Sequence, residues 1–314
     1  MSRPCRIEFL EVVDSTQRVA QAYVLSGDTR WDAVCAFHQT AGRGRQGADW
    51  HDTPSQSLLV SLILRQVPQH IPAHLVGVAV AIASALMLEG HFPQLRRVGL
   101  KFPNDLVLQG RKVGGVLVER VQEVLITGVG INLWQATFPP EIANTAISVR
   151  QVLENLTPPS PLSYEERGEA GVSPSPFVGE KGQGVEGFSD LTPPSPLSAS
   201  REGGEPSSPS PFTERGLGGE VKLAASIADE LHLRAQFIQT LWDTLYHLLT
   251  LTPDEWYRLW QRRDVTLGRA YRALDLPSQP IGTAIEVDPN FHLCLRLPDG
   301  SMHTTLHATS VSSV

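Results

Sequence analysis

The chain has 314 residues, of which 41% are hydrophobic and 19% charged, and its formal net charge is −7. This composition is typical of a globular protein, and an acidic balance without a run of Lys or Arg argues against a basic surface for nucleic acid. The three cysteines show no CxxC spacing, which indicates free thiols in a reducing compartment. The sequence shows no secretory leader and no apolar run long enough to span a membrane. We therefore expect a cytoplasmic protein without nucleic-acid or membrane partners.

The first half of the chain alternates strand-like and helix-like segments. Apolar periodicity distinguishes the two types, and Ser15 stands where it could cap the first helix. The predicted elements are a strand at 8–14, a helix at about 15–26, strands at 33–40 and 57–65, a core helix at 73–88, a hairpin at 106–119 that turns near Gly110, and a strand at 123–133.

A proline-rich segment interrupts this pattern at residues 157–218. It holds 11 of the 24 prolines, and its nine acidic and four basic residues supply −5 of the net charge. The sequences LTPPSPLS and SPSPF each occur twice, 35 residues apart, which indicates an internal duplication. The copies lack the apolar periodicity of a solenoid repeat, so we predict a disordered insertion that function tolerates.

The chain then resumes with an amphipathic helical stretch at 222–251. From about Asp264, short alternating strands with turns at Asp288-Pro-Asn and Pro298-Asp-Gly are typical of a small β-barrel. We therefore divide the chain into a catalytic domain (1–156 and 219–263), the insertion (157–218) and a C-terminal barrel (264–314).

The segment from Gln39 to Trp50, QTAGRGRQGADW, is the most informative motif. Its three glycines allow positive φ and close approach of the backbone to a ligand, while Arg43 and Arg45 add two fixed positive charges. Such a loop suits a carboxylate or a phosphate. It is neither a Walker phosphate loop nor a dinucleotide fingerprint, and on its own it is equally consistent with a solvated turn.

Three further motifs follow along the chain: KFPND at 101–105, RKVGGVLVE at 111–119 and GVGIN at 128–132. Lys112 lies just after the predicted hairpin turn, where its ammonium can neutralise charge on a reacting phosphate. Gly114 and Gly115 leave the strand without side chains, which makes room for a flat ligand. The alternative interpretations are an exposed hairpin lysine and ordinary turn residues.

Together, the four motifs in this order resemble the biotin–protein ligase family. The resemblance covers residues 8–150 and, less sharply, about 220–314. It implies an α+β fold in which a mixed β-sheet is backed by helices, as in class II aminoacyl-tRNA synthetases, followed by a small SH3-like β-barrel. It also implies a reaction in which biotin and Mg-ATP form biotinyl-5′-adenylate, whose biotinyl group then passes to a lysine of a biotin carboxyl carrier protein of acetyl-CoA carboxylase.

The resemblance assigns roles by matched position. The implied catalytic residues are Lys112, which bridges the biotin carboxyl and the α-phosphate, Arg45, which closes the loop, and Asp105, which serves the metal or the second step. The implied biotin contacts are Ser15, Thr16, Gln39, Arg43, Gly115 and Trp50. The implied nucleotide contacts are Gly42, Gly44, Arg45, Lys112 and Asn132, the last through the adenine. ATP and biotin are substrates with Mg²⁺, and no protein ligand to a metal is assigned. A homodimer is compatible with the resemblance.

The sequence departs from the family pattern at Gln17, where Asn is usual, and at Phe102, where Trp is usual. The Gly-Glu pair near the end of the family's barrel is missing, which puts carrier docking there in doubt. Too few residues precede the first strand for a helix-turn-helix domain, so we expect no DNA binding. The alternatives are a lipoate or octanoate ligase of the same fold and a paralogue that binds the adenylate without transferring it.

Overall fold

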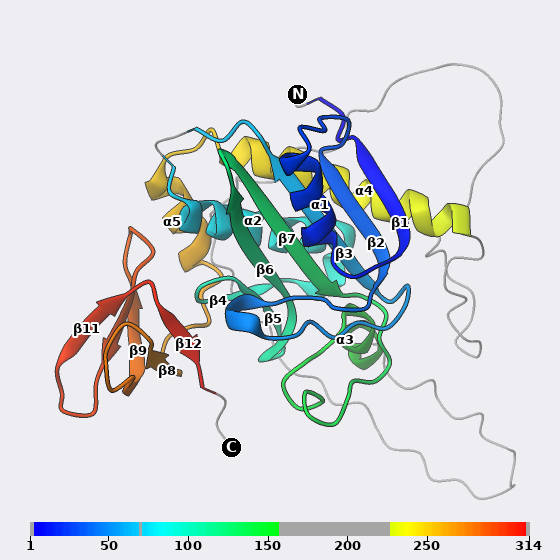
Figure 1. Ribbon diagram of the computed structural model, residues 1–314. Coiled ribbons are helices and arrows are strands. Elements are labelled where there is room, and N and C mark those ends of the chain that lie inside the picture. The colour runs from blue at the N-terminus through cyan, green and yellow to red at the C-terminus, as the bar shows by residue number, and fades with distance from the viewer. Residues whose placement is uncertain (1–2, 69–70, 157–226, 312–314) are drawn as a thin grey trace, which may run out of the picture. The chain divides into compact units, whose positions relative to one another are not determined.

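The computed structural model describes residues 3–68, 71–156 and 227–311. Its larger sheet has seven strands in the order β1-β2-β3-β7-β6-β5-β4 (Figure 1). β1 runs parallel to β2, and every other neighbouring pair is antiparallel, so the predicted mixed sheet is confirmed. The strands are β1 (Ile7–Val13), β2 (Ala33–Gln39), β3 (Ser57–Leu64), β4 (Gly99–Lys101), β5 (Asp105–Leu108), β6 (Arg111–Val121) and β7 (Val124–Asn132).

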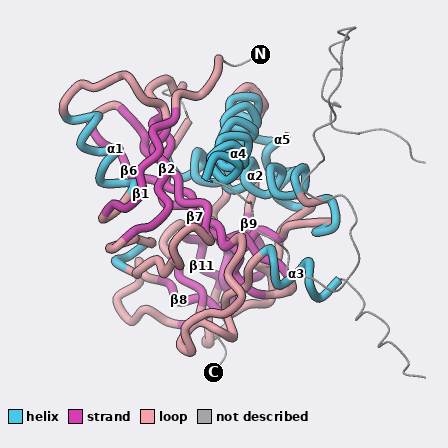
Figure 2. The backbone as a smooth tube through the Cα atoms, turned by 90° about the vertical axis from the view of Figure 1, so that its right-hand side faces the viewer, coloured by secondary structure: helices cyan, strands magenta, loops and turns pink. Residues whose placement is uncertain are grey.

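Helices cover both faces of this sheet, with α1 (Thr16–Leu25) on one side and α2 (Ala73–His91) with α4 (Ile227–Leu248) on the other (Figure 2). Successive strand residues point to opposite faces. Thus Val34 and Ile63 form a small core with α1, whereas Cys35 and Leu62 belong to the larger core with α2 and α4. The other helices are η1 (Arg45–Gly47), η2 (Pro93–Leu95), α3 (Val149–Leu156) and α5 (Pro253–Gln261).

The predicted core helix is confirmed as α2 and extends three residues further, to His91. By length and composition α2 is able to cross a membrane, but 67% of its most apolar window is buried inside the protein. The capping expectation for Ser15 needs correction. Ser15 occupies the N-cap position of α1, but its side chain makes no capping hydrogen bond.

The C-terminal strands form a second, antiparallel sheet in the order β11-β10-β9-β8-β12. Both predicted turns are present, between β9 and β10 and between β10 and β11. The sheet is tied to the larger one, because the hydroxyl of Tyr271 donates to the Phe102 carbonyl at 3.1 Å and the Phe102 amide donates to Thr266 Oγ1 at 2.9 Å. Its strands are β8 (Ala270–Ala273), β9 (Ile281–Val287), β10 (Leu293–Arg296), β11 (Met302–Thr305) and β12 (Ala308–Ser310).

The predicted insertion at 157–218 lies outside the described residues. The described segments before and after it belong to one compact unit. Arg234 of α4 shows how closely they are joined. Its guanidinium is buried and donates to the carbonyl of Ser57 at 2.6 Å and to that of Ser55 at 2.9 Å.

Candidate active site

A cavity of about 450 Å³ lies on the face of the larger sheet that carries α1. It is bounded by the N-terminus of α1, the glycine-rich loop, β6, β7 and β12. The structure thereby brings together most of the residues that the sequence nominated. Those that line the cavity are Ser15, Thr16, Gln39, Arg43, Gly44, Arg45, Trp50, Asp105, Lys112 and Gly115.

The glycine-rich loop folds back on itself as a small hairpin over the cavity. Arg43 forms a β-bridge with Asp49, and the Trp50 amide donates to the Gly42 carbonyl at 3.0 Å. Gly47 has a φ of +77°, a conformation that side chains disfavour. A Cβ on Gly42 would lie 2.8 Å from the Trp50 carbonyl oxygen. Gly42 therefore allows the two arms of the loop to approach, and it does not itself line the cavity.

At one end of the cavity, two lysines hold a single carboxylate. Lys112 Nζ lies 2.7 Å from Asp105 Oδ1, and Lys101 Nζ lies 3.0 Å from Asp105 Oδ2. Burial opposes ionisation of Asp105, but the charges of Lys112 and Lys101 outweigh it and hold the pKa of this carboxyl below its usual value. Asp105 is thus an ionised group with both oxygens occupied, which makes it a weak proton acceptor.

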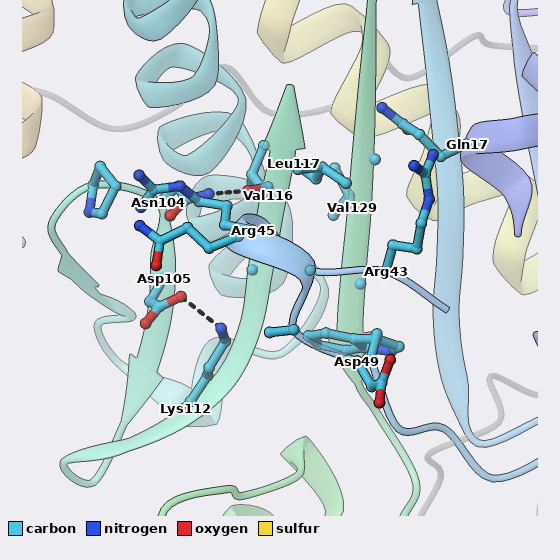
Figure 3. Close-up of a pocket in the computed structure, with 18 of the residues that line it drawn as sticks. Gln17, Arg43, Arg45, Asp49, Asn104, Asp105, Lys112, Val116, Leu117 and Val129 are labelled. Atoms are coloured by element: carbon cyan, nitrogen blue, oxygen red, sulfur yellow. Dashed lines mark hydrogen bonds and ion pairs between the residues drawn. The ribbon is translucent and has the colours of Figure 1, made fainter. Parts of the chain in front are cut away.

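Arg45 adds positive charge at the same end of the cavity. Its side chain extends toward Asn104 and Asp105 in Figure 3. Burial lowers the pKa of this guanidinium, although Asp105 opposes the shift, and an arginine stays charged in either case. Lys112 and Arg45 line the cavity with Asp105, and Lys101 contacts the same carboxylate, so the positive charges around Asp105 exceed its own by two. This end of the cavity therefore attracts an anion.

The other arginine of the loop, Arg43, is neutralised by an acidic side chain. Arg43 Nη2 donates to Glu119 Oε2 at 3.1 Å, and Gln21 of α1 donates to the same oxygen at 2.7 Å. Figure 3 shows Arg43 turned toward Gln17, away from Lys112. Glu119 ends the RKVGGVLVE motif, but its partner lies 76 residues away, so sequence spacing gave no sign of the pair.

The end of the cavity beside α1 is polar, and apart from the Arg43–Glu119 pair its contacts are between uncharged groups. Gln39 Oε1 accepts from the Thr16 amide at 2.8 Å, and the Thr16 and Ser61 hydroxyls lie 2.9 Å apart. Ser61 donates to Gln17 Oε1 at 2.9 Å, and Gln17 donates to the Ile126 carbonyl at 3.1 Å. Sequence reasoning missed Ser61, which lies within a strand of otherwise apolar residues. The network presents donors and acceptors suited to a neutral polar ring.

Glycines of β6 and β7 form the floor. A Cβ on Gly130 would lie 2.7 Å from the Trp50 ring, and one on Gly128 would lie 2.8 Å from Gln17 Oε1. The sequence analysis gave these two glycines no role of their own, although their spacing of two places them on one face of β7. Gly115 also faces the cavity. The expectation for Gly114 was wrong, because its Cβ would point at the Gly130 carbonyl oxygen, 2.8 Å away.

Two further findings concern residues outside the loop. Asn132 is buried at the end of β7, donates to the Ile147 carbonyl at 3.2 Å and does not line the cavity. The last strand does line it, since Ala308, Thr309 and Ser310 of β12 form part of the wall. Ser310 Oγ accepts from Lys101 Nζ at 3.1 Å. The sequence gave no sign that this strand reaches the site.

Comparisons with known proteins find relatives over the part of the chain that holds most of the site. Residues 9–135 match the model of the biotin/lipoate A/B protein ligase family. A bifunctional ligase/repressor BirA from Bacillus spizizenii is 33% identical over 157 residues, which cover 46% of each chain. A biotin–[acetyl-CoA-carboxylase] ligase from Mycobacterium tuberculosis is 36% identical over 120 residues, 37% of this chain and 44% of the relative. A solved structure of the biotin protein ligase from Aquifex aeolicus in complex with biotin and ATP aligns with a TM-score of 0.60 at 18% identity, over 98% of this chain and 99% of that one.

These matches differ in what they establish. The structural likeness, at 18% identity, supports the fold alone. The chain spans less than half the length of the curated relatives that it matches. The family model, however, covers the glycine-rich loop, Lys112 and the glycine floor, which are the parts that meet in the cavity. Residues 9–135, which hold most of the site, are similar to the biotin/lipoate A/B protein ligase family.

Proposed function

We propose that this protein is a biotin–protein ligase that activates biotin with ATP and transfers it to a lysine of a biotin carboxyl carrier protein. The observation that carries the proposal is the division of charge within one cavity. Lys112 and Arg45 line one end together with Asp105, whose charge is shared with Lys101. The network of Thr16 and Gln39 at the other end is uncharged. An acid with a neutral polar head fits this division, with its carboxylate toward the lysines.

In the first step, a carboxylate oxygen of biotin attacks the α-phosphorus of ATP, and the bond to pyrophosphate breaks. Lys112 is 41% exposed and lies beside the cavity, so its ammonium is available to the phosphate oxygens on which charge develops. Asp105 holds Lys112 in place through the 2.7 Å ion pair. Arg45, on the loop above, supplies a second cation to the same oxygens.

In the second step, the neutral amine of the carrier lysine attacks the acyl carbon, an amide forms and AMP leaves. The mixed anhydride must be kept from water until then, which suits the loop that covers the cavity. The low pKa of Asp105 makes it a poor base for the incoming amine. We therefore assign Asp105 to positioning Lys112 and not to proton removal.

Mg²⁺ is expected to enter as Mg-ATP. Both Asp105 oxygens already contact ammonium groups, and no group of three or more His, Cys, Asp or Glu side chains gathers within the described ranges. The finer assignments stay predictions: Asn132 as an adenine contact, an SH3-like C-terminal barrel, kinship with class II synthetases, a cytoplasmic location, the absence of nucleic-acid and membrane partners, and a homodimer.

The test is ATP–pyrophosphate exchange with biotin or lipoate, followed by transfer to a biotin carboxyl carrier domain. We expect biotin-dependent exchange and carrier labelling. Lys112→Ala should lower exchange at least about a hundredfold, because a preorganised charge at the phosphate is lost. Lys112→Arg should keep binding with partial activity. The exposed Arg18→Ala serves as a charge-matched control and should leave exchange unchanged.

Two results would redirect the assignment. Exchange with lipoate but not biotin would make the chain a lipoate ligase, which shares the family. Tight biotin binding without exchange would identify a paralogue that holds its ligand without activating it. The division of charge argues against the second alternative, since binding a vitamin requires no lysine beside a phosphate.

A further inference from the structure

A second hollow of about 390 Å³ lies away from the catalytic cavity. Three arginines, Arg3, Arg6 and Arg65, line it around one acid, Asp32. Asp32 directly precedes β2 and Arg65 directly follows β3, whereas Gln39, at the other end of β2, lines the catalytic cavity. The hollow therefore sits at the opposite end of these strands.

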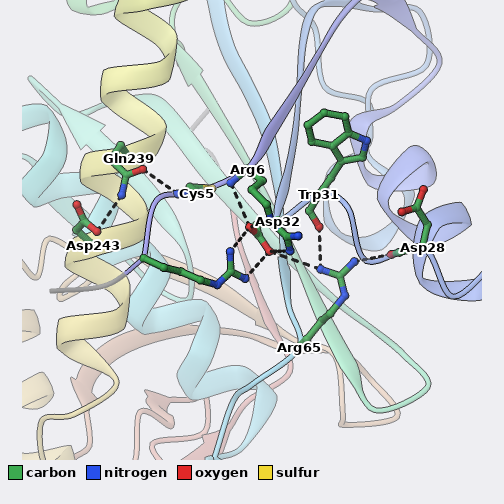
Figure 4. A network of polar contacts seen from close by, with 9 residues as sticks. Cys5, Arg6, Asp28, Trp31, Asp32, Arg65, Gln239 and Asp243 are labelled. Atoms are coloured by element: carbon green, nitrogen blue, oxygen red, sulfur yellow. Dashed lines mark hydrogen bonds and ion pairs between the residues drawn. The ribbon is translucent and has the colours of Figure 1, made fainter.

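Asp32 is fully used by the arginines. Its Oδ1 accepts from Arg3 Nη2 at 2.7 Å and from Arg6 Nη2 at 3.0 Å. Its Oδ2 accepts from Arg3 Nη1 at 2.5 Å, from Arg6 Nε at 2.9 Å and from the Arg6 amide at 3.1 Å. Figure 4 shows Arg6 and Arg65 directed at this carboxylate. The Asp32 side chain is only 1% exposed. Its hydrogen bonds to the arginines outweigh the free-energy cost of removing the carboxylate from water.

The three arginines carry more positive charge than Asp32 can neutralise. Asp32 is the one acid among the described residues that line the hollow, so three guanidinium groups leave an excess of two charges. Arg65 uses Nη1 and Nη2 on the carbonyls of Trp31 and Asp28, both at 2.8 Å. Within the described part of the chain, Arg65 Nε and Arg6 Nη1 donate no hydrogen bond. Guanidinium donors in a fixed array are suited to a phosphate-type oxyanion.

One side of the hollow is formed by aromatic residues of α4. The Arg3 guanidinium lies 5.8 Å from the centroid of the Trp242 ring. Burial raises the pKa of the Tyr246 hydroxyl, which therefore remains a donor. These residues line the hollow together with the arginines. The walls thus offer hydrogen-bond donors and positive charge, and little that would bind a cation.

We propose that this hollow binds a phosphate dianion, either free or as the phosphate group of a small metabolite. The ligand accepts from Arg6, Arg65 and the Tyr246 hydroxyl, and its two charges cancel the excess. It thereby joins the N-terminal segment, the ends of β2 and β3, and α4. The site is independent of the proposed ligase reaction.

The test measures binding of inorganic phosphate and of glycerol phosphate by ³¹P NMR and by thermal unfolding, with chloride at equal ionic strength as reference. We expect saturable binding and a phosphate-specific rise in Tm. Arg6→Gln should weaken binding by about tenfold, the effect of one lost charge-assisted contact. It should still fold, because Asp32 keeps Arg3 and the Arg6 amide. Tighter binding of glycerol phosphate than of phosphate would identify a metabolite site, and equal binding a site for the free ion.

Two control variants separate this hollow from other sites. Lys112→Ala should leave the phosphate binding that depends on Arg6 intact, because Lys112 lines the catalytic cavity and not this hollow. Arg30→Gln removes an exposed arginine that pairs with Asp28 outside the hollow, and it should also have no effect. Absence of any effect of phosphate beyond chloride would overturn the proposal. Loss of binding in Lys112→Ala with full binding in Arg6→Gln would overturn it equally.

Discussion

Single residues in the catalytic cavity are paired in ways that decide their chemistry. Arg43 and Arg45 are two residues apart in one loop, yet Glu119 neutralises the first, whereas the second faces an end with excess positive charge. The motif alone gave each of them only as a fixed positive charge. The structure assigns them different electrostatic roles, because Arg43 pairs with Glu119 whereas Arg45 lies near Asp105, whose oxygens already contact two lysines.

The ion pairs of Asp105 with two lysines make the free energy of unfolding depend on pH, and a variant of Asp105 can reveal this dependence. The folded-state pKa of Asp105 is depressed, so its contribution is present above the unfolded value of about 3.9 and is lost as the pH falls through the lower folded value. We expect Asp105→Asn to be less stable than the parent at pH about 7, with a difference that shrinks below pH about 4. Urea denaturation across this pH range measures it. A difference that persists unchanged in acid would contradict the ion-pair explanation.

At the scale of elements, periodicity predicted the strands of the larger sheet and its core helix. It missed β4, which has three residues, and α3, which has eight. It also missed α5, although Thr252 and Glu255 form a capping box that the sequence displays. The pairing of β3 with β7 and the arrival of β12 at the cavity depend on contacts between distant segments. Local sequence patterns carry no information on such contacts.

Strand β12 offers a test of how the C-terminal sheet contributes to catalysis. Ser310 accepts a hydrogen bond from Lys101, which in turn contacts Asp105. We expect Ser310→Ala to raise the KM for ATP about three- to tenfold while the KM for biotin changes little, because one hydrogen bond to a charged group is lost at the phosphate end. Thr304→Ala, on an exposed position of β11, is the matched control. Equal changes in both KM values would indicate a general structural defect.

For the whole molecule, the described cavity residues lie on both sides of the duplicated segment in the sequence. We expect deletion of these residues to leave pyrophosphate exchange within about twofold of the full chain, since long surface insertions add little to the entropy of loop closure. Circular dichroism and exchange on the deletion protein measure this. A folded deletion protein with a large loss of exchange would show that the segment takes part in catalysis.

The position of Arg234 has a consequence for how the polypeptide can be assembled. This arginine follows the insertion in the chain, yet it is held by the carbonyls of Ser55 and Ser57, and neighbouring side chains of α4 complete the core around α2. Neither half can bury its apolar surface without the other. The contacts between the two halves also include directed hydrogen bonds, such as those of Arg234, which only the correct partner provides. The protein therefore lends itself to fragment complementation, in which residues 1–156 and 227–314, made as separate polypeptides, recover activity only when they meet.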